Sequence, residues 1–340
     1  MAWACEDWIE LAIEQGLELV DELIIAIGAF HPYFKKIEDR TYMKAKKYFN
    51  NKKIKIVETL CNPKNNADQN RAATANYILK ESGLIEVGDV VWTLDADEFY
   101  SKEAIREIGE YIKNNDFEEI YVKDRMFCIN FNYYIDFEHA RLLKIKDYHT
   151  HFKPPQRIYP RPKEKVVILE KNPMFHYSML MGEQMKGIQW MLEGISQAVI
   201  WYKKIYNNYD PENETLWLKK NQELTGNYRF WRDDHKGIEE KNGHGFFRYD
   251  GKHPEIIERS PLRNISDFRE YMKNKPNYPA YLAAMRQLIN EKKRFDYKIL
   301  LLKISESELW QRLFLRFKER LIRIRLMKKI FGKLQKYMEN

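Results

Sequence analysis

Two aspartates that are one residue apart, Asp95 and Asp97, directly follow the strand-like segment Asp89–Leu94. Side chains alternate along extended chain, so the two carboxylates are expected to point roughly the same way. Carboxylate oxygens suit Mg²⁺ or Mn²⁺, and such a cation keeps positions open for phosphate oxygens and water. It could then act as a Lewis acid on a departing diphosphate. The alternative is a solvated acidic turn or helix cap, because a bare Asp-x-Asp is common by chance.

The elements around this pair alternate along the chain. The expected helices are 6–20, 40–50, 67–82 and 102–114, and the expected strands are 22–27, 54–57, 89–94 and 118–123. This alternation predicts an α/β fold with a mostly parallel sheet flanked by helices. Ligands of such sheets bind at the carboxyl ends of the strands, where Asp95 and Asp97 stand.

The pattern loosens after residue 124. Further strands are expected within 126–131 and 166–169, and further helices over 181–208, 264–295 and 305–337. We therefore predict a domain over 1–260 and a helical extension over 261–340 that ends in a basic amphipathic helix.

Composition limits the class of protein. The chain has 340 residues, of which 44% are hydrophobic and 14% aromatic, as expected of a globular protein. We find no apolar run long enough for a transmembrane helix and no basic-then-apolar signal peptide. The cysteines Cys5, Cys61 and Cys128 lack metal-site spacing and fit free thiols in a reducing compartment. The expected location is the cytoplasm.

Charge is concentrated in the tail. Residues 311–340 contain ten basic and two acidic residues, which accounts for the whole net charge of +8 and leaves the rest of the chain neutral. A neutral body argues against nucleic acid as a partner. The apolar stripe and basic flanks of 306–337 fit a helix in the interface of an anionic membrane, on its cytoplasmic face. The alternative is a helix packed on the domain or on a partner chain.

The segment Val91–Phe99 resembles the signature of family 2-like glycosyltransferases of the GT-A fold, in which a hydrophobic strand is followed by Leu-Asp-Ala-Asp-Glu. The resemblance implies a nucleotide-sugar donor and a Mn²⁺ or Mg²⁺ cofactor. It assigns Asp97 to the metal, Asp95 to the metal or the ribose, and Glu98 to substrate binding.

Upstream segments extend the resemblance and also depart from it. Gln69–Arg71 is similar to the family's Arg-Asn neighbourhood, which implies that Arg71 binds the nucleotide, although the order here is Asn then Arg. Ala4–Glu10 is similar to the first strand end and Asn-Glu-Glu helix start, but Cys5 replaces the Asn, and only Met1–Ala4 remain for the strand. Ala26–Phe30 lacks the family's nucleoside-binding Asp.

Downstream, Phe175–Ser178 resembles the block in which related transferases place a His that contacts the metal or the diphosphate. The resemblance implies a metal-binding role for His176 and a substrate-binding role for Lys186, although a lone His is often purely structural. Gly251–Glu255, which contains His253, resembles a short motif without a known chemical role.

An inverting enzyme of this kind also needs a general base near the acceptor, usually a carboxylate. The candidates are Asp136, Glu138 and Glu183, each of which could instead be an ordinary surface carboxylate. The sequence does not decide between inversion and retention. A glycan or a lipid-linked acceptor is expected, the latter if the tail meets a membrane.

Three other classes compete. A nucleotidyltransferase also uses paired strand-end carboxylates, but the Gly-rich phosphate loop it usually has is not evident. A glycosidase needs two carboxylates across a bond, which rarely stand one residue apart. A non-catalytic nucleotide- or glycan-binding relative is favoured by Cys5 and by the missing Asp near Gly28.

Overall fold

The computed structural model describes residues 5–35, 37, 40–65, 67–146, 151–153, 157–159, 165–180, 208–225, 246–280, 282–284, 287 and 290. Outside these residues lie the expected short strand Met1–Ala4, residues 181–207 of the expected helix 181–208 with Glu183 and Lys186, and the basic helix 306–337. The chain divides into two compact units, Met1–Arg286 and Gln287–Asn340, and the features below belong to the first.

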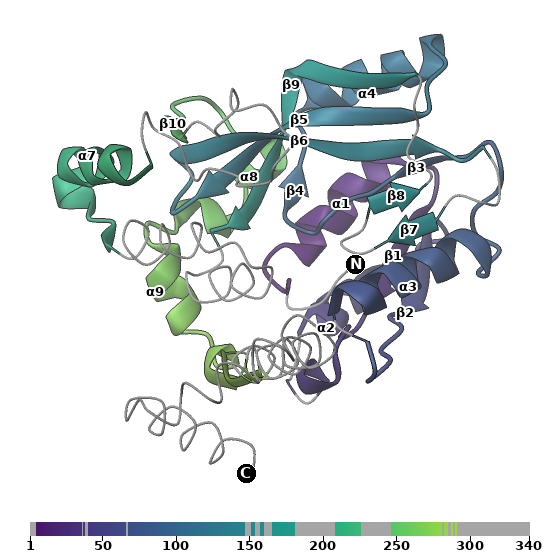
Figure 1. The fold of residues 1–340 in the computed structure, drawn as a ribbon, viewed down its shortest axis with the longest axis horizontal. Coiled ribbons are helices and arrows are strands. Elements are labelled where there is room, and N and C mark those ends of the chain that lie inside the picture. The colour runs from purple at the N-terminus through teal and green to yellow at the C-terminus, as the bar shows by residue number, and fades with distance from the viewer. Residues whose placement is uncertain are drawn as a thin grey trace, which may run out of the picture. The chain divides into compact units, whose positions relative to one another are not determined.

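The first unit combines helices and strands (Figure 1). The α-helices are α1 (Ile9–Leu19), α2 (Thr41–Ala45), α3 (Ala67–Lys80), α4 (Lys102–Asn114), α7 (Glu214–Thr225), α8 (Glu255–Glu258) and α9 (Phe268–Lys273). The strands are β1 (Leu23–Ile27), β2 (Ile54–Glu58), β3 (Val90–Trp92), β4 (Glu98–Phe99), β5 (Glu119–Cys128), β6 (Tyr133–Lys144), β7 (His151–Lys153), β8 (Arg157–Tyr159), β9 (Val166–Met179) and β10 (Phe246–Arg248). Short 3₁₀ turns are η1 (Pro32–Phe34), η2 (Lys46–Tyr48), η4 (Pro211–Asn213) and η5 (Pro261–Asn264).

The largest sheet has the strand order β10-β6-β5-β9-β4, and β3 also pairs with β6. The expected α/β class is confirmed, but the expected mostly parallel arrangement is wrong for the described strands. β5 pairs with β9 and β1 with β2 in parallel, whereas every other described pairing is antiparallel. The main reason is the tight link 129–132 between β5 and β6, because so short a connection can join only antiparallel strands.

Strands β1 and β2 form a two-stranded parallel sheet, and their carboxyl ends lie side by side. Gly28 follows β1 with φ 124°, a conformation that side chains rarely adopt. A Cβ atom at this position would lie 2.8 Å from Oγ1 of Thr59, which follows β2. Glycine is therefore required at this close approach of the two strand ends.

Helices α1 and α4 are positioned by their apolar faces. In α4, Ser101 caps the first turn by accepting a hydrogen bond from the backbone N–H of Ala104 at 3.2 Å. Ala104 and Ile108 are buried against a cluster that includes Ile120 of β5. The other helix, α1, contacts both β1 and β4, so it links the small sheet to the edge of the large one.

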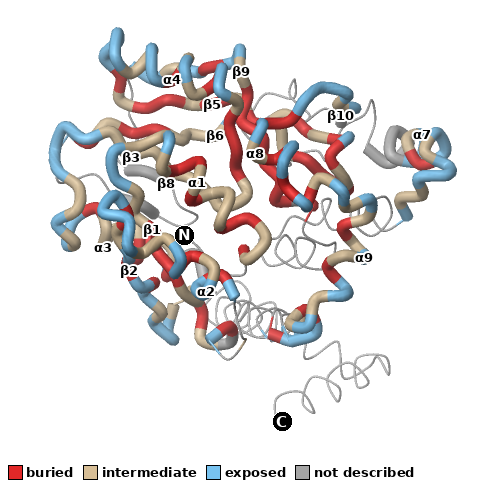
Figure 2. Tube along the Cα trace, turned by 180° about the vertical axis from the view of Figure 1, so that it is seen from behind, coloured by how far each residue is buried: buried red, intermediate tan, exposed pale blue. Residues whose placement is uncertain are grey.

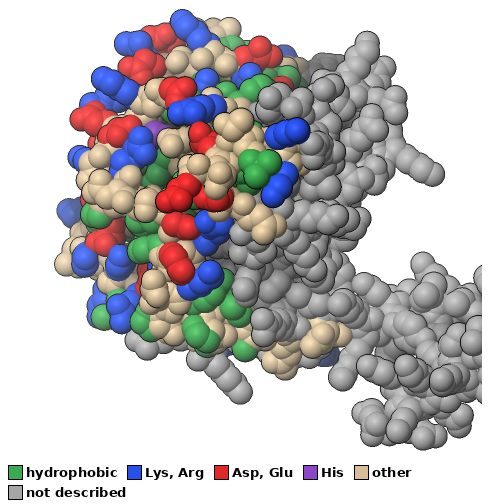
Figure 3. All heavy atoms as spheres, turned by 90° about the vertical axis from the view of Figure 1, so that its left-hand side faces the viewer, with side chains coloured by type: hydrophobic (Ala, Val, Ile, Leu, Met, Phe, Trp, Pro, Cys, Tyr) green, Lys and Arg blue, Asp and Glu red, His purple; other side chains and the backbone are tan. Residues whose placement is uncertain are grey.

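Buried positions run along β5, β6 and β9, as Figure 2 shows. Beside them lies an aromatic core that contains Trp8, Phe99, Phe127 and Tyr177. Leu262 and Phe268 belong to the same core, which is why the first unit continues past residue 260. Acidic and basic side chains are interspersed over the described part of the face in Figure 3, as expected for a neutral body.

Candidate metal centre

The acidic pair lies in a turn between β3 and β4 that is fastened to β6. The backbone N–H of Thr93 donates to the carbonyl of Arg141 at 2.7 Å, and the Thr93 hydroxyl donates to the same oxygen at 3.1 Å. At the other end of the turn, the N–H of Asp95 donates to Oε2 of Glu98 at 3.2 Å. The turn therefore has a fixed backbone from which Asp95 and Asp97 project.

His176 reaches this turn from β9. It stands opposite Glu98 in the antiparallel pairing of β4 with β9. Its Nε2 lies 3.7 Å from Oδ1 of Asp97 and 3.9 Å from Oε1 of Glu98. One ligand atom each from Asp95, Glu98 and His176 fall within 4.8 Å of one another, a grouping that could hold a metal ion. Of the three residues expected to bind metal, this grouping contains Asp95 and His176, whereas Asp97 lies beside it through the 3.7 Å approach to His176.

Glu98 is expected to bind substrate, but its side chain is buried beneath the turn. Its carboxylate is fully buried, one oxygen forms an ion pair with Arg141, and the other accepts the N–H of Asp95. Its backbone carbonyl accepts from Nε2 of Gln15 in α1 at 3.1 Å. In this arrangement Glu98 supports the turn from beneath.

Arg141 supplies the positive charge at the centre of the turn. Besides the ion pair with Glu98, its Nη2 lies 4.0 Å from Oδ2 of Asp95, whose side chain is 46% exposed. Burial alone would raise the pKa of Asp95, but the charges of Arg141 and His176 outweigh burial and lower it. Asp95 is therefore an ionised, partly accessible carboxylate.

Burial and neighbouring charges also shift the pKa values of Glu98 and His176. Burial, reinforced by the negative charge of Asp95, raises the pKa of Glu98 to about 7 in spite of Arg141. Burial would lower the pKa of His176, but Asp124, Asp97 and Glu98 together raise it to about 9. The carboxylates around His176 thus favour a positive charge at this point, which a proton or a metal cation can provide.

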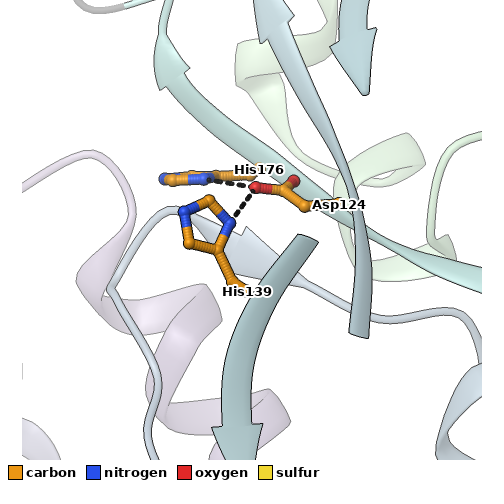
Figure 4. A group of neighbouring side chains, drawn as sticks. All are labelled: Asp124, His139 and His176. Atoms are coloured by element: carbon orange, nitrogen blue, oxygen red, sulfur yellow. Dashed lines mark hydrogen bonds and ion pairs between the residues drawn. The ribbon is translucent and has the colours of Figure 1, made fainter. Parts of the chain in front are cut away.

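A second group of side chains lies on three neighbouring strands. Oδ2 of Asp124 on β5 is 2.8 Å from Nδ1 of His139 on β6 and 3.1 Å from Nδ1 of His176 on β9 (Figure 4). Asp124 is completely buried, and its two imidazole neighbours lower its pKa although burial opposes them. These three residues also could hold a metal ion, and His176 belongs to both groups.

Two of the expected general bases, Asp136 and Glu138, lie on the face of the sheet opposite to that of Asp124 and His139. Asp136 and Glu138 are two residues apart on β6 and share a face with Lys123 of β5, which lies 3.9 Å from Asp136. His139, which bonds to Asp124, faces the opposite way because side chains alternate along a strand. The structure therefore does not bring Asp136 or Glu138 to the acidic turn, and Glu183 lies outside the described residues.

Arg71 lies near the ends of β1 and β2. Its guanidinium stacks over the ring of Phe30 at 4.2 Å, and its charge contributes to the lowered pKa of Asp95. Its neighbour Asn70 is buried and ties together the loops that follow the two strands. The Asn70 amide donates to the carbonyl of Phe30 at 2.9 Å and accepts from the N–H of Asn62 at 3.0 Å. Arg71 is thus held near the ends of β1 and β2, while Lys186 lies outside the described residues.

His253 is a buried core residue that is hydrogen-bonded through both ring nitrogens. Its Nε2 donates to the carbonyl of Phe131 at 3.0 Å, and its Nδ1 accepts from the hydroxyl of Tyr177 at 2.8 Å. Burial lowers its pKa to about 4, so the ring is neutral inside the aromatic core. The motif Gly251–Glu255 therefore begins α8 and completes the core.

Sequence reasoning missed Asp124, His139 and Arg141. One signal was available for Asp124, because Ile120, Val122 and Asp124 occupy alternate positions of β5 and all are buried. A carboxylate that continues a buried apolar row must have a specific partner. His139 meets its partner through the pairing of β6 with β5, and Arg141 meets Glu98 and Asp95 in the turn that follows β3, so no local pattern marks either residue.

Comparisons of the chain with known protein families, with curated proteins and with solved structures found no match. Within the described residues, no helix is long and apolar enough to cross a membrane.

Proposed function

We propose that this chain is a metal-dependent glycosyltransferase of the GT-A type, which moves a sugar from a nucleotide-diphosphate donor to a glycan or lipid-linked acceptor. The observation that carries the proposal is the approach of His176 Nε2 to Asp97, at 3.7 Å, beside the fixed acidic turn. A nitrogen donor from β9 and carboxylates from the strand-end turn make a mixed ligand set for a divalent cation.

In this proposal Asp97 and His176 hold the cation, and Asp95 either completes the set or contacts the ribose. The bound cation supplies Lewis-acid stabilisation of the charge on the departing diphosphate. Because one donor is an imidazole, Mn²⁺ suits the set better than Mg²⁺, which is bound almost entirely by oxygen. Glu98 and Arg141 keep the turn in place and bury opposite charges beneath it.

Arg71 supports the same proposal from the other sheet. Its guanidinium is oriented by Phe30 and lies where its charge acts on Asp95. A fixed guanidinium suits contacts to phosphate oxygens of a donor. We assign Arg71 to the nucleotide-diphosphate, at the carboxyl ends of β1 and β2.

A donor-hydrolysis screen of the full chain with Mn²⁺ and with Mg²⁺ tests the proposal, with UDP-, GDP- and TDP-sugars as substrates. We expect hydrolysis of at least one donor, more with Mn²⁺ than with Mg²⁺, and none with EDTA. If no donor is hydrolysed and no nucleotide raises the thermal unfolding temperature, the transferase proposal fails and a non-catalytic role replaces it.

A further inference from the structure

The group around Asp124 has a geometry that the proposed metal ligands alone do not explain. In the large sheet β5 lies between β6 and β9, and Asp124, His139 and His176 come one from each of these strands. Both imidazoles direct Nδ1 at one oxygen, Oδ2 of Asp124. The other oxygen, Oδ1, is buried and has no hydrogen-bond partner among the described residues. The charge of this carboxylate is therefore stabilised through its two histidines.

The direction of the hydrogen bond from His176 fixes the chemistry of its ring. An ionised carboxylate can only accept hydrogen bonds, so Nδ1 of His176 must carry the proton and donate, whereas Nδ1 of His139 lies 2.8 Å from the same oxygen at ion-pair distance. A histidine that donates from Nδ1 has Nε2 as the nitrogen with which it can bind a metal. In Figure 4 the Nε2 atoms lie on the sides of the rings away from Asp124. For His176 that side is the one that faces Asp97 and Glu98.

From this geometry we infer that Asp124 is a positioning residue for the cation, one that acts through His176. It holds His176 with a proton on Nδ1 and with Nε2 aimed at the acidic turn, and His139 fixes Asp124 from the other side. The inference rests on the proposed function, because it concerns the same cation, but it assigns a residue that touches neither cation nor donor. A carboxylate behind a metal-binding histidine typically improves metal affinity 10- to 100-fold.

The competing interpretation places the cation between Asp124, His139 and His176 themselves, since these atoms also could hold a metal ion. The two interpretations differ in what His139 does. If the cation binds at Asp97, replacement of His139 removes only its contact with Asp124 and no metal ligand. If the cation binds at Asp124, His139 is a direct ligand and its replacement costs as much as that of His176.

Calorimetric titration of the full chain with Mn²⁺ separates these cases without any measurement of catalysis. The variants are Asp97→Asn, His176→Gln, Asp124→Asn and His139→Gln, with Asp21→Asn as the matched control, because Asp21 is exposed in the turn before β1. We expect Asp97→Asn and His176→Gln to abolish binding. Asp124→Asn should weaken it by about 10- to 100-fold at an unchanged stoichiometry of one ion, and His139→Gln by less than about fivefold. The control should bind as the wild type does.

The possible failures are distinguishable. Unchanged affinity in Asp124→Asn, with binding abolished in Asp97→Asn, overturns the positioning role and leaves the proposed function intact. Equal losses in His139→Gln and His176→Gln, with Asp97→Asn unaffected, move the cation to Asp124 and overturn both. No binding by the wild type also overturns both.

A second measurement covers the case in which Asp124→Asn does not fold. Nitrogen-15 spectra of the histidine side chains can be recorded on the wild type saturated with Zn²⁺, a diamagnetic probe. For His176 we expect a protonated Nδ1 and a metal-bound Nε2. A metal-bound Nδ1 would contradict the inference directly.

Discussion

Glu98 and His176 face each other across the antiparallel pair of β4 and β9, far apart in sequence and adjacent in space. Their pairing sets the geometry of the site, because the backbone of β4 leads directly out of the acidic turn. The next backbone bond reinforces it, since the N–H of Tyr177 donates to the carbonyl of Asp97 at 2.9 Å. The distance between His176 and Asp97 thus follows from strand register as much as from side-chain conformation.

The first prediction concerns Asp97. Replacement by Asn keeps the shape of the side chain but removes the charge that a cation would need, so metal-dependent donor turnover should fall by at least about 100-fold, a loss of roughly 3 kcal/mol of transition-state stabilisation. The unfolding midpoint in urea should change little, because Asn keeps the size of the side chain and the contact of Asp97 with His176 is long, at 3.7 Å. Turnover assays and urea titrations of this variant and of Asp21→Asn provide the comparison. Full activity in Asp97→Asn would exclude a role of the acidic pair in catalysis.

The second prediction compares two ion pairs. Arg141→Met removes the cation that neutralises buried Glu98, which should cost about 3 kcal/mol in the free energy of unfolding. The cost is limited because Glu98, whose pKa is already raised to about 7, can bind a proton instead. Arg259→Met is the control, since Arg259 and Glu14 form an exposed pair worth less than about 1 kcal/mol. Similar effects of the two substitutions on urea unfolding would show that the pair beneath the turn does not stabilise the fold.

The third prediction is a pH effect from His253. Its pKa in the folded chain is lowered to about 4 from an ordinary value of 6.5, so between these values the unfolded chain binds a proton that the folded chain does not. Stability from this residue is therefore complete above pH 6.5 and is lost as the pH falls toward 4, by roughly 3 kcal/mol in total.

The matched variant is His253→Gln, whose amide can still donate to the carbonyl of Phe131. It should be less stable than the wild type at pH 7, and the difference should shrink as the pH falls to 4. Subtraction of the two urea-unfolding series removes the contributions of other groups. A constant difference across this range would show that His253 titrates normally in the fold.

The fourth prediction contrasts two glycines. Gly28→Ala forces a side chain into φ 124° and against Thr59, and should destabilise the chain by about 1–3 kcal/mol. Gly109→Ala lies in the exposed face of α4 with open space around the new Cβ, and should stabilise it by about 0.5–1 kcal/mol. Thermal unfolding of both variants measures the opposite signs. Addition of Thr59→Ala to Gly28→Ala should recover the steric part of the loss but not the backbone strain.

Individual helices and strands can be predicted from the sequence because the residue patterns that define them span only one segment of the chain. The helix expected over 102–114 has the observed bounds of α4, whose cap at Ser101 and buried residues Ala104 and Ile108 all lie within one short segment. Strand β1 was likewise predicted as an apolar run that ends at Gly28. Whether strands pair in parallel or antiparallel cannot be predicted in this way, because it depends on which strands meet. The sequence analysis does not predict the β5–β6 hairpin.

The candidate site divides in the same way. Asp95 and Asp97 can be identified from the sequence because the two carboxylates lie close together in the chain, directly after a strand. Asp136 follows the acidic pair in the chain, but the register of β6 turns its side chain to the face of Lys123. Asp124 acquires its partners from two other strands, so its role follows only from the three-dimensional arrangement.

The pairing of β5 with β9 has a consequence for how the molecule folds. These strands are parallel, so the chain must cross over before β9 can add to β5, and the whole of β6 is synthesised in between. Contacts of such long sequence separation form slowly. The attachment of the turn to β6 can form before β9 docks, whereas the pairing of β4 and the nitrogen donor of the site are in place only when β9 has docked. A folding intermediate without β9 would therefore contain Asp95 and Asp97 but lack the proposed metal affinity, so the gain of cation binding would report one of the last steps of folding.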